Sequence, residues 1–226
     1  MKPGTRSASG AILMLAIIPS IIGLLACMPV PIGNPERSRI DPDISGVWAM
    51  LGDGDEAFYA FEPYDKRTWL LTGVPIEEGD EADLSAYDLE TYEDLVTLMK
   101  NEPVGDDGVT ATSMIMYKAW RTRLGGEWFM TWEPKGQLGA GDFNPDYWVV
   151  LKFTKPDADT INLYLVNGDA KVFKDVKKTR RAYERVLKKN LESKDVISEE
   201  PLRLFRLQPE HLAFVEELAG EVIDVD

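Results

Sequence analysis

Cys27 is the residue of this sequence with the clearest capacity for chemistry, because it is the only cysteine among 226 residues. A thiol can act as a nucleophile, a disulfide partner, a metal ligand or an acceptor for lipid, and its neighbours decide among these roles. The residues before it, Leu24, Leu25 and Ala26, end the first apolar run of the chain. A lone cysteine in an exported chain otherwise predicts a free thiol or an intermolecular disulfide. Neither alternative explains the apolar run.

The residues before the cysteine have the layout of a secretory signal peptide. Lys2 and Arg6 are basic, no acidic residue precedes the cysteine, and residues 11–26 are apolar apart from one serine. This combination is typical of a signal peptide. A membrane span is the alternative, but it needs ~20 uninterrupted apolar residues, and this run is shorter and is interrupted by Pro19 and Gly23. We therefore expect residues 1–26 to be a signal peptide.

Leu24-Leu25-Ala26-Cys27 resembles the lipobox of bacterial lipoproteins. In that family the thiol is alkylated by a diacylglycerol, the leader is cut before the cysteine, and the new amino terminus is usually acylated. The resemblance implies that Cys27 carries the lipid anchor. Each buried methylene contributes about 0.8 kcal/mol, so two or three acyl chains anchor stably. With Met28 after the cysteine, the resemblance also implies a place in the outer membrane, facing the periplasm.

Groups that could catalyse a reaction are few. His211 is the only histidine, which is too few for a histidine-based zinc site and leaves a catalytic triad without visible partners. Asp142, Asn144 and Asp146 resemble the start of a calcium loop, but Tyr147 replaces the required glycine and the closing acidic residue is missing. Carboxylate pairs of the glycosidase type depend on a separation in space that a sequence does not give. We predict a protein that is not an enzyme and that has no metal and no cofactor.

Aromatic residues are the second group that points to a function. Six tryptophans, eight tyrosines and eight phenylalanines are enough to line an apolar pocket, which is the usual setting of a small-molecule site. The residues predicted to line a pocket or to close a barrel are Trp48, Trp120, Trp128, Trp132 and Trp148. An eight-stranded barrel is just wide enough to be packed solid or to hold one small ligand. That geometry favours a packed core and keeps a pocket for an apolar ligand as a hypothesis.

The chain is acidic except for one basic stretch. Its formal net charge is −14, which disfavours nucleic acid and anionic lipid as main partners. Residues 171–189 are rich in lysine and arginine, and a basic amphipathic helix can lie on an anionic bilayer. The residues predicted to form a membrane or partner surface are Lys177, Lys178, Arg180, Arg181 and Lys188. The alternative is a solvated helix face that balances acidic neighbours, and screening by salt favours it.

The rest of the chain predicts a succession of short strands with added helices. Residues 27–43 contain four prolines and no periodicity, so we expect an extended tether. Residues 44–170 contain six or seven strands joined by short turns, among them a Gly-Gly hairpin signal. A change of period over residues 83–100 predicts one inserted helix. Residues 171–226 are predicted to form a basic helix, a short strand and a C-terminal helix packed on the strands.

Two stretches resemble known barrel proteins. Gly46-Val47-Trp48 is the G-x-W that opens lipocalin-like barrels, and residues 117–132 are similar to the central hairpin of an uncharacterised group of bacterial lipocalin-like lipoproteins. The resemblance implies a mostly β fold, an up-and-down antiparallel β-barrel or half-barrel, with Trp48 plugging its closed end. A β-sandwich is the alternative, but its Greek-key crossings are disfavoured by the short turns.

The sequence therefore predicts a lipoprotein that is bound to the envelope membrane through lipid on Cys27. The first hypothesis for its role is that the barrel holds a small apolar ligand. The alternative is a non-catalytic interaction protein, whose solid barrel docks an envelope protein.

Overall fold

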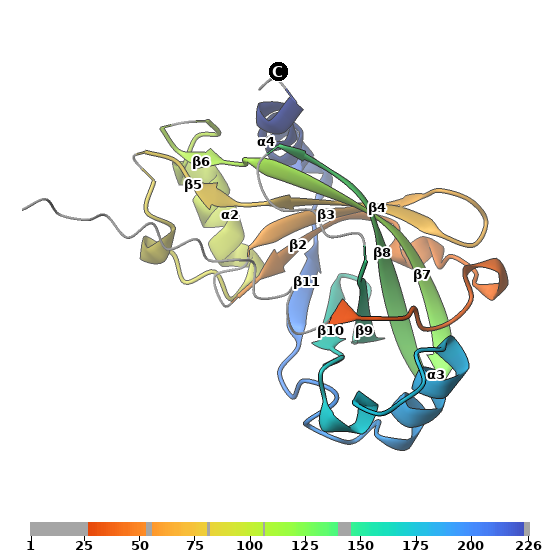
Figure 1. The fold of residues 1–226 in the computed structure, drawn as a ribbon. Coiled ribbons are helices and arrows are strands. Elements are labelled where there is room, and N and C mark those ends of the chain that lie inside the picture. The colour runs from red at the N-terminus through yellow and green to blue at the C-terminus, as the bar shows by residue number, and fades with distance from the viewer. Residues whose placement is uncertain (1–26, 53–55, 81, 106, 140–145, 224–226) are drawn as a thin grey trace, which may run out of the picture.

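Eight antiparallel strands form a closed barrel in the computed structural model (Figure 1), which describes residues 27–52, 56–80, 82–105, 107–139 and 146–223. The barrel strands are β2 (Gly46–Leu51), β3 (Ala57–Pro63), β4 (Trp69–Pro75), β7 (Ser113–Leu124), β8 (Glu127–Gly139), β9 (Trp148–Thr154), β10 (Thr160–Leu165) and β11 (Leu202–Arg206). Each strand pairs with the next one along the chain, and β11 pairs with β2. The predicted up-and-down barrel is confirmed. It is closed, which excludes the half-barrel and the sandwich.

Alternation of side chains along these strands fills the barrel interior, because successive residues of a strand point to opposite faces. On β2, Trp48 and Met50 point inward, whereas Ala49 between them belongs to an outer apolar layer. The buried interior residues are Ile44, Trp48, Met50, Ala57, Tyr59, Phe61, Trp69, Leu71, Ala119, Met130, Trp132, Val149, Leu151, Phe153, Ile161, Leu163 and Leu204. The two faces of the wall are therefore both apolar over much of the barrel.

Residues 40–45 cover one end of the barrel, where Trp48 is completely buried. The indole Nε1–H of Trp48 donates to the carbonyl oxygen of Ile44 at 2.8 Å. The guanidinium carbon of Arg206 lies over the ring, 4.2 Å from its centroid. Arg206 also donates to the carbonyl oxygens of Ser45, at 3.0 Å, and Asp43. Trp48 and Arg206 together fasten the covering segment to the first and last barrel strands.

Two helices cover the outer face of β2, β3 and β4. They are α2 (Tyr92–Asn101) and α4 (Leu212–Ile223), which share an apolar layer with Phe58 and Val74. The inserted helix is shorter than the predicted residues 83–100. It begins after Thr91, whose side chain forms a reciprocal capping box with Asp94. Residues 84–86 form a separate 3-10 turn. A small two-stranded sheet of β5 (Glu77–Glu78) and β6 (Val109–Thr110) joins this region.

The C-terminal region contributes to the barrel as well as covering it. The predicted short strand is β11, the eighth barrel strand, rather than part of an appendage. The basic stretch forms a 3-10 turn at residues 171–173 and then α3 (Arg180–Lys189). Tyr183 and Leu187 of α3 are buried in an apolar layer outside β8 and β9. None of the described helices is long and apolar enough to cross a membrane.

The segment after Cys27 is folded onto the barrel, in contrast to the extended tether that we predicted. Strand β1 (Cys27–Met28) pairs with β9, and Met28 and Ile32 are completely buried. The carbonyl oxygen of Ile32 accepts hydrogen bonds from Trp120 Nε1, at 2.9 Å, and Thr131 Oγ1, at 2.8 Å. Two donors from neighbouring strands thus hold this segment on the wall. The predicted signal peptide, residues 1–26, lies outside the described residues.

Replacing Trp48 tests how much the covered barrel end contributes to stability. We expect Trp48→Ala to lower the free energy of unfolding by about 3–5 kcal/mol, because it leaves a large cavity in the core. Trp128→Ala is the matched control, since its side chain is 36 % exposed; there we expect a loss of about 1–2 kcal/mol. Urea unfolding followed by circular dichroism measures both. Equal losses would contradict a dominant role for Trp48.

Candidate functional site

An aromatic cluster around Trp132 forms the part of the barrel interior that could recognise a ligand. The ring centroid of Trp132 lies 5.3 Å from that of Tyr59, 5.6 Å from that of Tyr117 and 6.4 Å from that of Phe61. These residues come from β8, β3, β7 and β3 respectively. The tilted and edge-on arrangements are the favourable ones for aromatic pairs. The cluster therefore joins three strands through large rings.

The cluster contains three polar groups, the indole N–H of Trp132 and the hydroxyl groups of Tyr59 and Tyr117. The indole Nε1–H of Trp132 is buried and has no hydrogen-bond partner among the described residues, a situation that costs about 1–3 kcal/mol. Tyr117 is half-buried, and burial raises the pKa of its phenol to about 12, with a smaller contribution from nearby Cys27. A carbonyl or carboxylate oxygen placed beside this indole could accept a hydrogen bond from it.

The interior around the cluster is nonetheless filled by side chains. Trp48, Trp69 and Leu71 are completely buried, and Trp132 is 3 % exposed. Two hollows stand out in the described part of the chain, with volumes of about 520 and 560 Å³. Neither is lined by any of the buried interior residues. Both belong to the outer surface.

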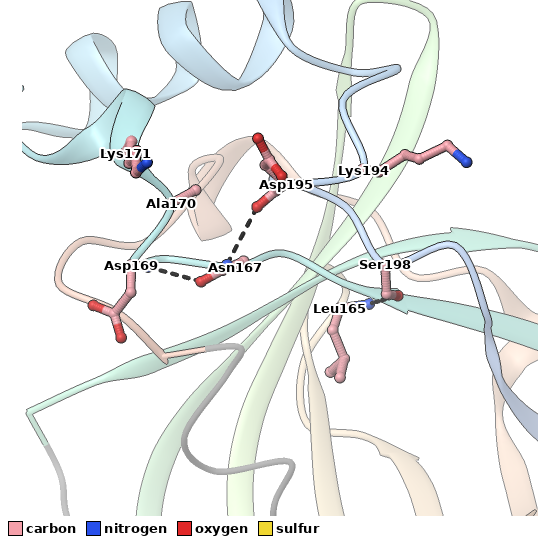
Figure 2. Close-up of a pocket in the computed structure, with 8 residues that line it drawn as sticks. All are labelled: Leu165, Asn167, Asp169, Ala170, Lys171, Lys194, Asp195 and Ser198. Carbon is pink, nitrogen blue, oxygen red and sulfur yellow. Dashed lines mark hydrogen bonds between the residues drawn. The ribbon is translucent and has the colours of Figure 1, made fainter.

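The first hollow lies where the chain leaves β10 and returns to β11 (Figure 2). Its lining residues are Leu165, Asn167, Asp169, Ala170, Lys171, Lys194, Asp195 and Ser198. Asn167 joins its two sides, because its Nδ2–H donates to the carbonyl oxygen of Asp195 at 3.2 Å and its Oδ1 accepts from the backbone N–H of Asp169 at 3.0 Å. In Figure 2 the ammonium group of Lys194 points away from Asn167. The polar groups of the hollow therefore mainly form hydrogen bonds within the segment that connects β10 to β11.

The second hollow is cationic. It is lined by Glu36, Arg37, Ser38, Arg39, Ile40, Lys66 and Arg67, from the segment before β2 and from the β3–β4 hairpin. Ser38 Oγ donates to the carbonyl oxygen of Arg121 at 2.9 Å and accepts from its backbone N–H at 3.2 Å. Within the described residues, no three His, Cys, Asp or Glu side chains are grouped so that they could hold a metal ion.

The structure separates the five tryptophans that we predicted to line a pocket or close a barrel. Trp48 and Trp132 lie inside the barrel. Trp120 lies on the outer face beneath residues 30–33, to which its indole donates. Trp128 lies near the β7–β8 hairpin, with the guanidinium groups of Arg121 and Arg123 at 4.7 and 5.7 Å from its ring. Trp148 pairs with Met28 in the sheet. The five do not form one mouth.

Cys27, the predicted lipidation site, lies at the edge of the barrel. It pairs with Val149 of β9, and its side chain is partly buried. Burial raises the pKa of its thiol, and the charge of Asp169 raises it further. Gly168 makes this placement feasible, because a Cβ atom there would lie 2.1 Å from the carbonyl oxygen of Cys27. A low-pKa, nucleophilic thiol is not what this environment produces.

The five basic residues predicted as a surface are also not equivalent. Lys177, Lys178, Arg181 and Lys188 are exposed. Arg180 is partly buried; it forms an ion pair with Glu184, at 3.8 Å, and donates to the carbonyl oxygen of Gly33 at 3.3 Å. Arg180 therefore helps to hold the N-terminal segment, while the other four remain available to a partner.

His211, the only histidine, joins two covering helices. Its Nδ1 forms a hydrogen bond with the hydroxyl group of Tyr92 at 2.8 Å. The same hydroxyl accepts from the backbone N–H of Gln208 at 3.0 Å. The histidine thus links α2 to the start of α4. Asp142 and Asn144, of the weak calcium-loop pattern, lie outside the described residues.

Sequence reasoning missed two groups that matter for these sites. Arg206 covers Trp48, and the carbonyl oxygen of Ile32 receives two side-chain donors. The only sequence signal for Arg206 was an arginine in the alternating stretch 201–207. The Ile32 carbonyl oxygen is a backbone atom and leaves no signal in the sequence.

A scan against protein-family models and comparisons with curated proteins and with solved structures found no match.

The titration of Tyr117 tests the burial of the aromatic cluster. Because its pKa in the folded protein, about 12, lies above the ordinary value of 10.0, its contribution to stability is complete below pH 10 and is lost as the pH rises toward 12. We expect the free energy of unfolding to fall by about 2 kcal/mol more in the wild type than in Tyr117→Phe between those pH values. Tyr64→Phe, at a position that is 66 % exposed, should behave like the wild type. An identical pH dependence of all three proteins would contradict burial of Tyr117.

Proposed function

We propose that this protein is a lipid-anchored, non-catalytic interaction module of the bacterial envelope, in which a solid barrel supports a surface that docks a protein partner. The anchor is supported by the resemblance of residues 24–27 to a lipobox. The choice of docking over ligand carriage is supported by one observation above all. The barrel interior is occupied by its own side chains, including three tryptophans.

The filled interior supports docking over ligand carriage because of the size of the barrel. An eight-stranded barrel has room either for packed side chains or for one small ligand. Trp48, Trp69 and Trp132 all point into this barrel, together with Phe61 and Phe153. Aromatic residues bury 150–250 Å² each, so that several of them leave little volume for a guest. A surface function then remains for the folded domain.

Mass spectrometry of the intact protein tests the solid barrel. The lipidated chain is purified from membranes in mild detergent, and its mass is recorded under native and then denaturing conditions. We expect equal masses, because the covalent lipid persists and no ligand is lost. A stoichiometric adduct that disappears on denaturation would overturn the solid barrel and identify the class of ligand. Trp48→Ala, purified in the same way, provides the control. Because this substitution leaves a cavity in the core, we expect its native mass to include bound small molecules.

Carriage of a small apolar ligand is the second candidate, favoured by the unpaired Nε1–H of Trp132. An apolar ligand with a single carbonyl or carboxylate oxygen would satisfy this donor, and the rings of Tyr59 and Tyr117 beside it would contact its apolar part. Entry requires movement of the side chains that now fill the barrel. The adduct in the preceding experiment is the result that would favour this candidate.

Replacing Cys27 tests the anchor. We expect the wild type to remain in the membrane fraction after a wash with 0.5 M NaCl, and its N-terminal peptide to carry the mass of a diacylglycerol. Cys27→Ser removes the acceptor atom, so its N-terminal peptide should lack this mass. The salt matters because it screens charges beyond ~4 Å and so removes binding that depends on charge alone. A wild-type N-terminal peptide without the mass of a diacylglycerol would contradict the anchor.

A further inference from the structure

The charges of this acidic protein are segregated along the sequence and in space. Residues 169–195 contain ten basic and five acidic residues, whereas residues 76–107 contain one basic and twelve acidic residues. Residues 208–226 add six acidic residues and no lysine or arginine. In Figure 1, α3 lies at the lower right of the barrel, while α2 lies at the left and α4 at the top. The molecule therefore has one basic side and one acidic side.

The basic side has a defined set of exposed cations, which we call the basic face. Its members are Lys171, Lys174, Lys177, Lys178, Arg181, Arg185, Lys188 and Lys189, all of them exposed. Tyr183 and Leu187 point from α3 into the apolar layer on β8 and β9, so the positions between them on the opposite side of the helix point to solvent. No member of the basic face forms an ion pair with another described residue.

Cys27 lies beside this basic face. The segment that follows it, residues 28–33, packs with Phe173, Tyr183 and Leu187 in one apolar layer. Its Gly33 donates a backbone N–H to Glu184 Oε1 of α3 at 3.0 Å. The carbonyl oxygen of Cys27 also approaches Gly168 closely, and Gly168 is three residues before Lys171. The anchor site and the basic face are therefore parts of one side of the molecule.

The anchor site is also fixed to the barrel, which gives the anchor an orienting effect. Cys27 pairs with β9, and the next residues are buried, with Met28 and Ile32 completely covered. A flexible tether would let the domain rotate freely above the membrane. Here the described chain has no flexible spacer between the anchor site and the barrel wall. Lipid on Cys27 must bring the neighbouring surface to the bilayer.

We propose that the lipidated protein lies with its basic face on anionic phospholipid of the membrane that holds its anchor, so that α2 and α4 point away from the bilayer. This proposal rests on the lipid anchor of the proposed function. Each lysine or arginine near an anionic surface strengthens binding by about fivefold, and the effect is confined to the ~10 Å over which charge is not screened. Tyr147, which is 42 % exposed, and Trp148, beside Met28 in the sheet, add aromatic side chains of the kind enriched at membrane interfaces.

The acidic side gives the same orientation by repulsion. Glu93 of α2 and Glu216 and Glu217 of α4 are exposed, and like charges are driven away from an anionic leaflet. Attraction on one side and repulsion on the other act on a body that is held at a fixed point. The acidic side is then the surface that remains accessible to a protein partner in the proposed function.

Energy transfer from single labels to the bilayer tests this orientation. In the lipidated chain the thiol of Cys27 is consumed, so that a new cysteine is the only group to label. Lys178→Cys places a fluorophore on the basic face, and Glu93→Cys places it on α2. Each protein is reconstituted into vesicles of phosphatidylcholine with a quarter of phosphatidylglycerol, which contain a headgroup-labelled acceptor lipid.

We expect transfer from the Lys178→Cys label to exceed that from the Glu93→Cys label at least threefold, and the difference to shrink in 0.5 M NaCl or on phosphatidylcholine alone. Equal transfer from the two sites would overturn the proposal. An unchanged difference on phosphatidylcholine alone would overturn anionic lipid as what the basic face contacts.

Charge reversal provides the second measurement. In this measurement the fluorophore is attached to Arg185→Cys, which also lies on the basic face. We expect transfer from this label to exceed that from the Glu93→Cys label, and we expect Lys177→Glu/Lys178→Glu/Arg181→Glu to abolish this excess. Lys66→Glu/Arg67→Glu/Lys100→Glu is the matched control, because it changes the net charge equally at exposed positions away from α3; it should keep the excess. Equal loss in both triple variants would overturn the basic face. Thermal unfolding of both variants verifies that they are folded.

The mass of the N-terminal peptide separates failure of this proposal from failure of the anchor. Diacylglycerol on Cys27 together with equal transfer from both labels overturns the orientation and leaves the anchor standing. A peptide without diacylglycerol overturns the anchor. In that case vesicle binding is compared between Lys177→Glu/Lys178→Glu/Arg181→Glu and its control. Binding that is lost only in the first variant would support the basic face as a surface that binds anionic lipid without an anchor.

Discussion

The pairing of β11 with β2 is the constraint on which the rest of the structure depends. It joins the last strand to the first, and it places Arg206 opposite Trp48 in the register. The guanidinium group can then cover the indole and reach the carbonyl oxygens of residues 43 and 45. Barrel closure, burial of Trp48 and the position of the covering segment are therefore coupled, because loss of the strand pair would release all three.

Apolar side chains lie on both faces of the barrel wall, and the inner and outer faces pack against different parts of the chain. The inner set fills the lumen, and two outer sets bind α2 with α4, and α3 with residues 28–33. Burial on both faces contributes stability at roughly 25 cal/mol per Å² of apolar surface. It also means that the covering elements are held by the same strands that make the core. The surface which they expose, basic on one side and acidic on the other, is thus a fixed property of the fold.

Period-2 alternation and short turns made the barrel strands and their order predictable; on β9, for example, Leu151 and Phe153 point inward and Lys152 between them is less buried. The helix bounds were less predictable, because a capping box at Thr91 starts α2 later than the apolar spacing suggested. The five tryptophans could not be placed from sequence. Which face each one occupies depends on strand register, and Trp120 and Trp132 lie on opposite faces of the wall although both are buried. The docking of residues 28–33 depends on the Ile32 carbonyl oxygen, for which side-chain identity carries no information.

A filled barrel and a docked N-terminal segment change what a lipid anchor does for the domain. With a flexible tether, the anchor only raises the local concentration of the protein at the membrane, and any surface can meet any partner. With Cys27 held against β9, the proposed anchor would also select which side faces the bilayer. That side carries the eight exposed cations, whereas α2 and α4, on the other side, carry the exposed Glu93, Glu216 and Glu217. In the proposed orientation, charge and attachment therefore act together, and a partner that approaches from the aqueous side would meet α2 and α4 first.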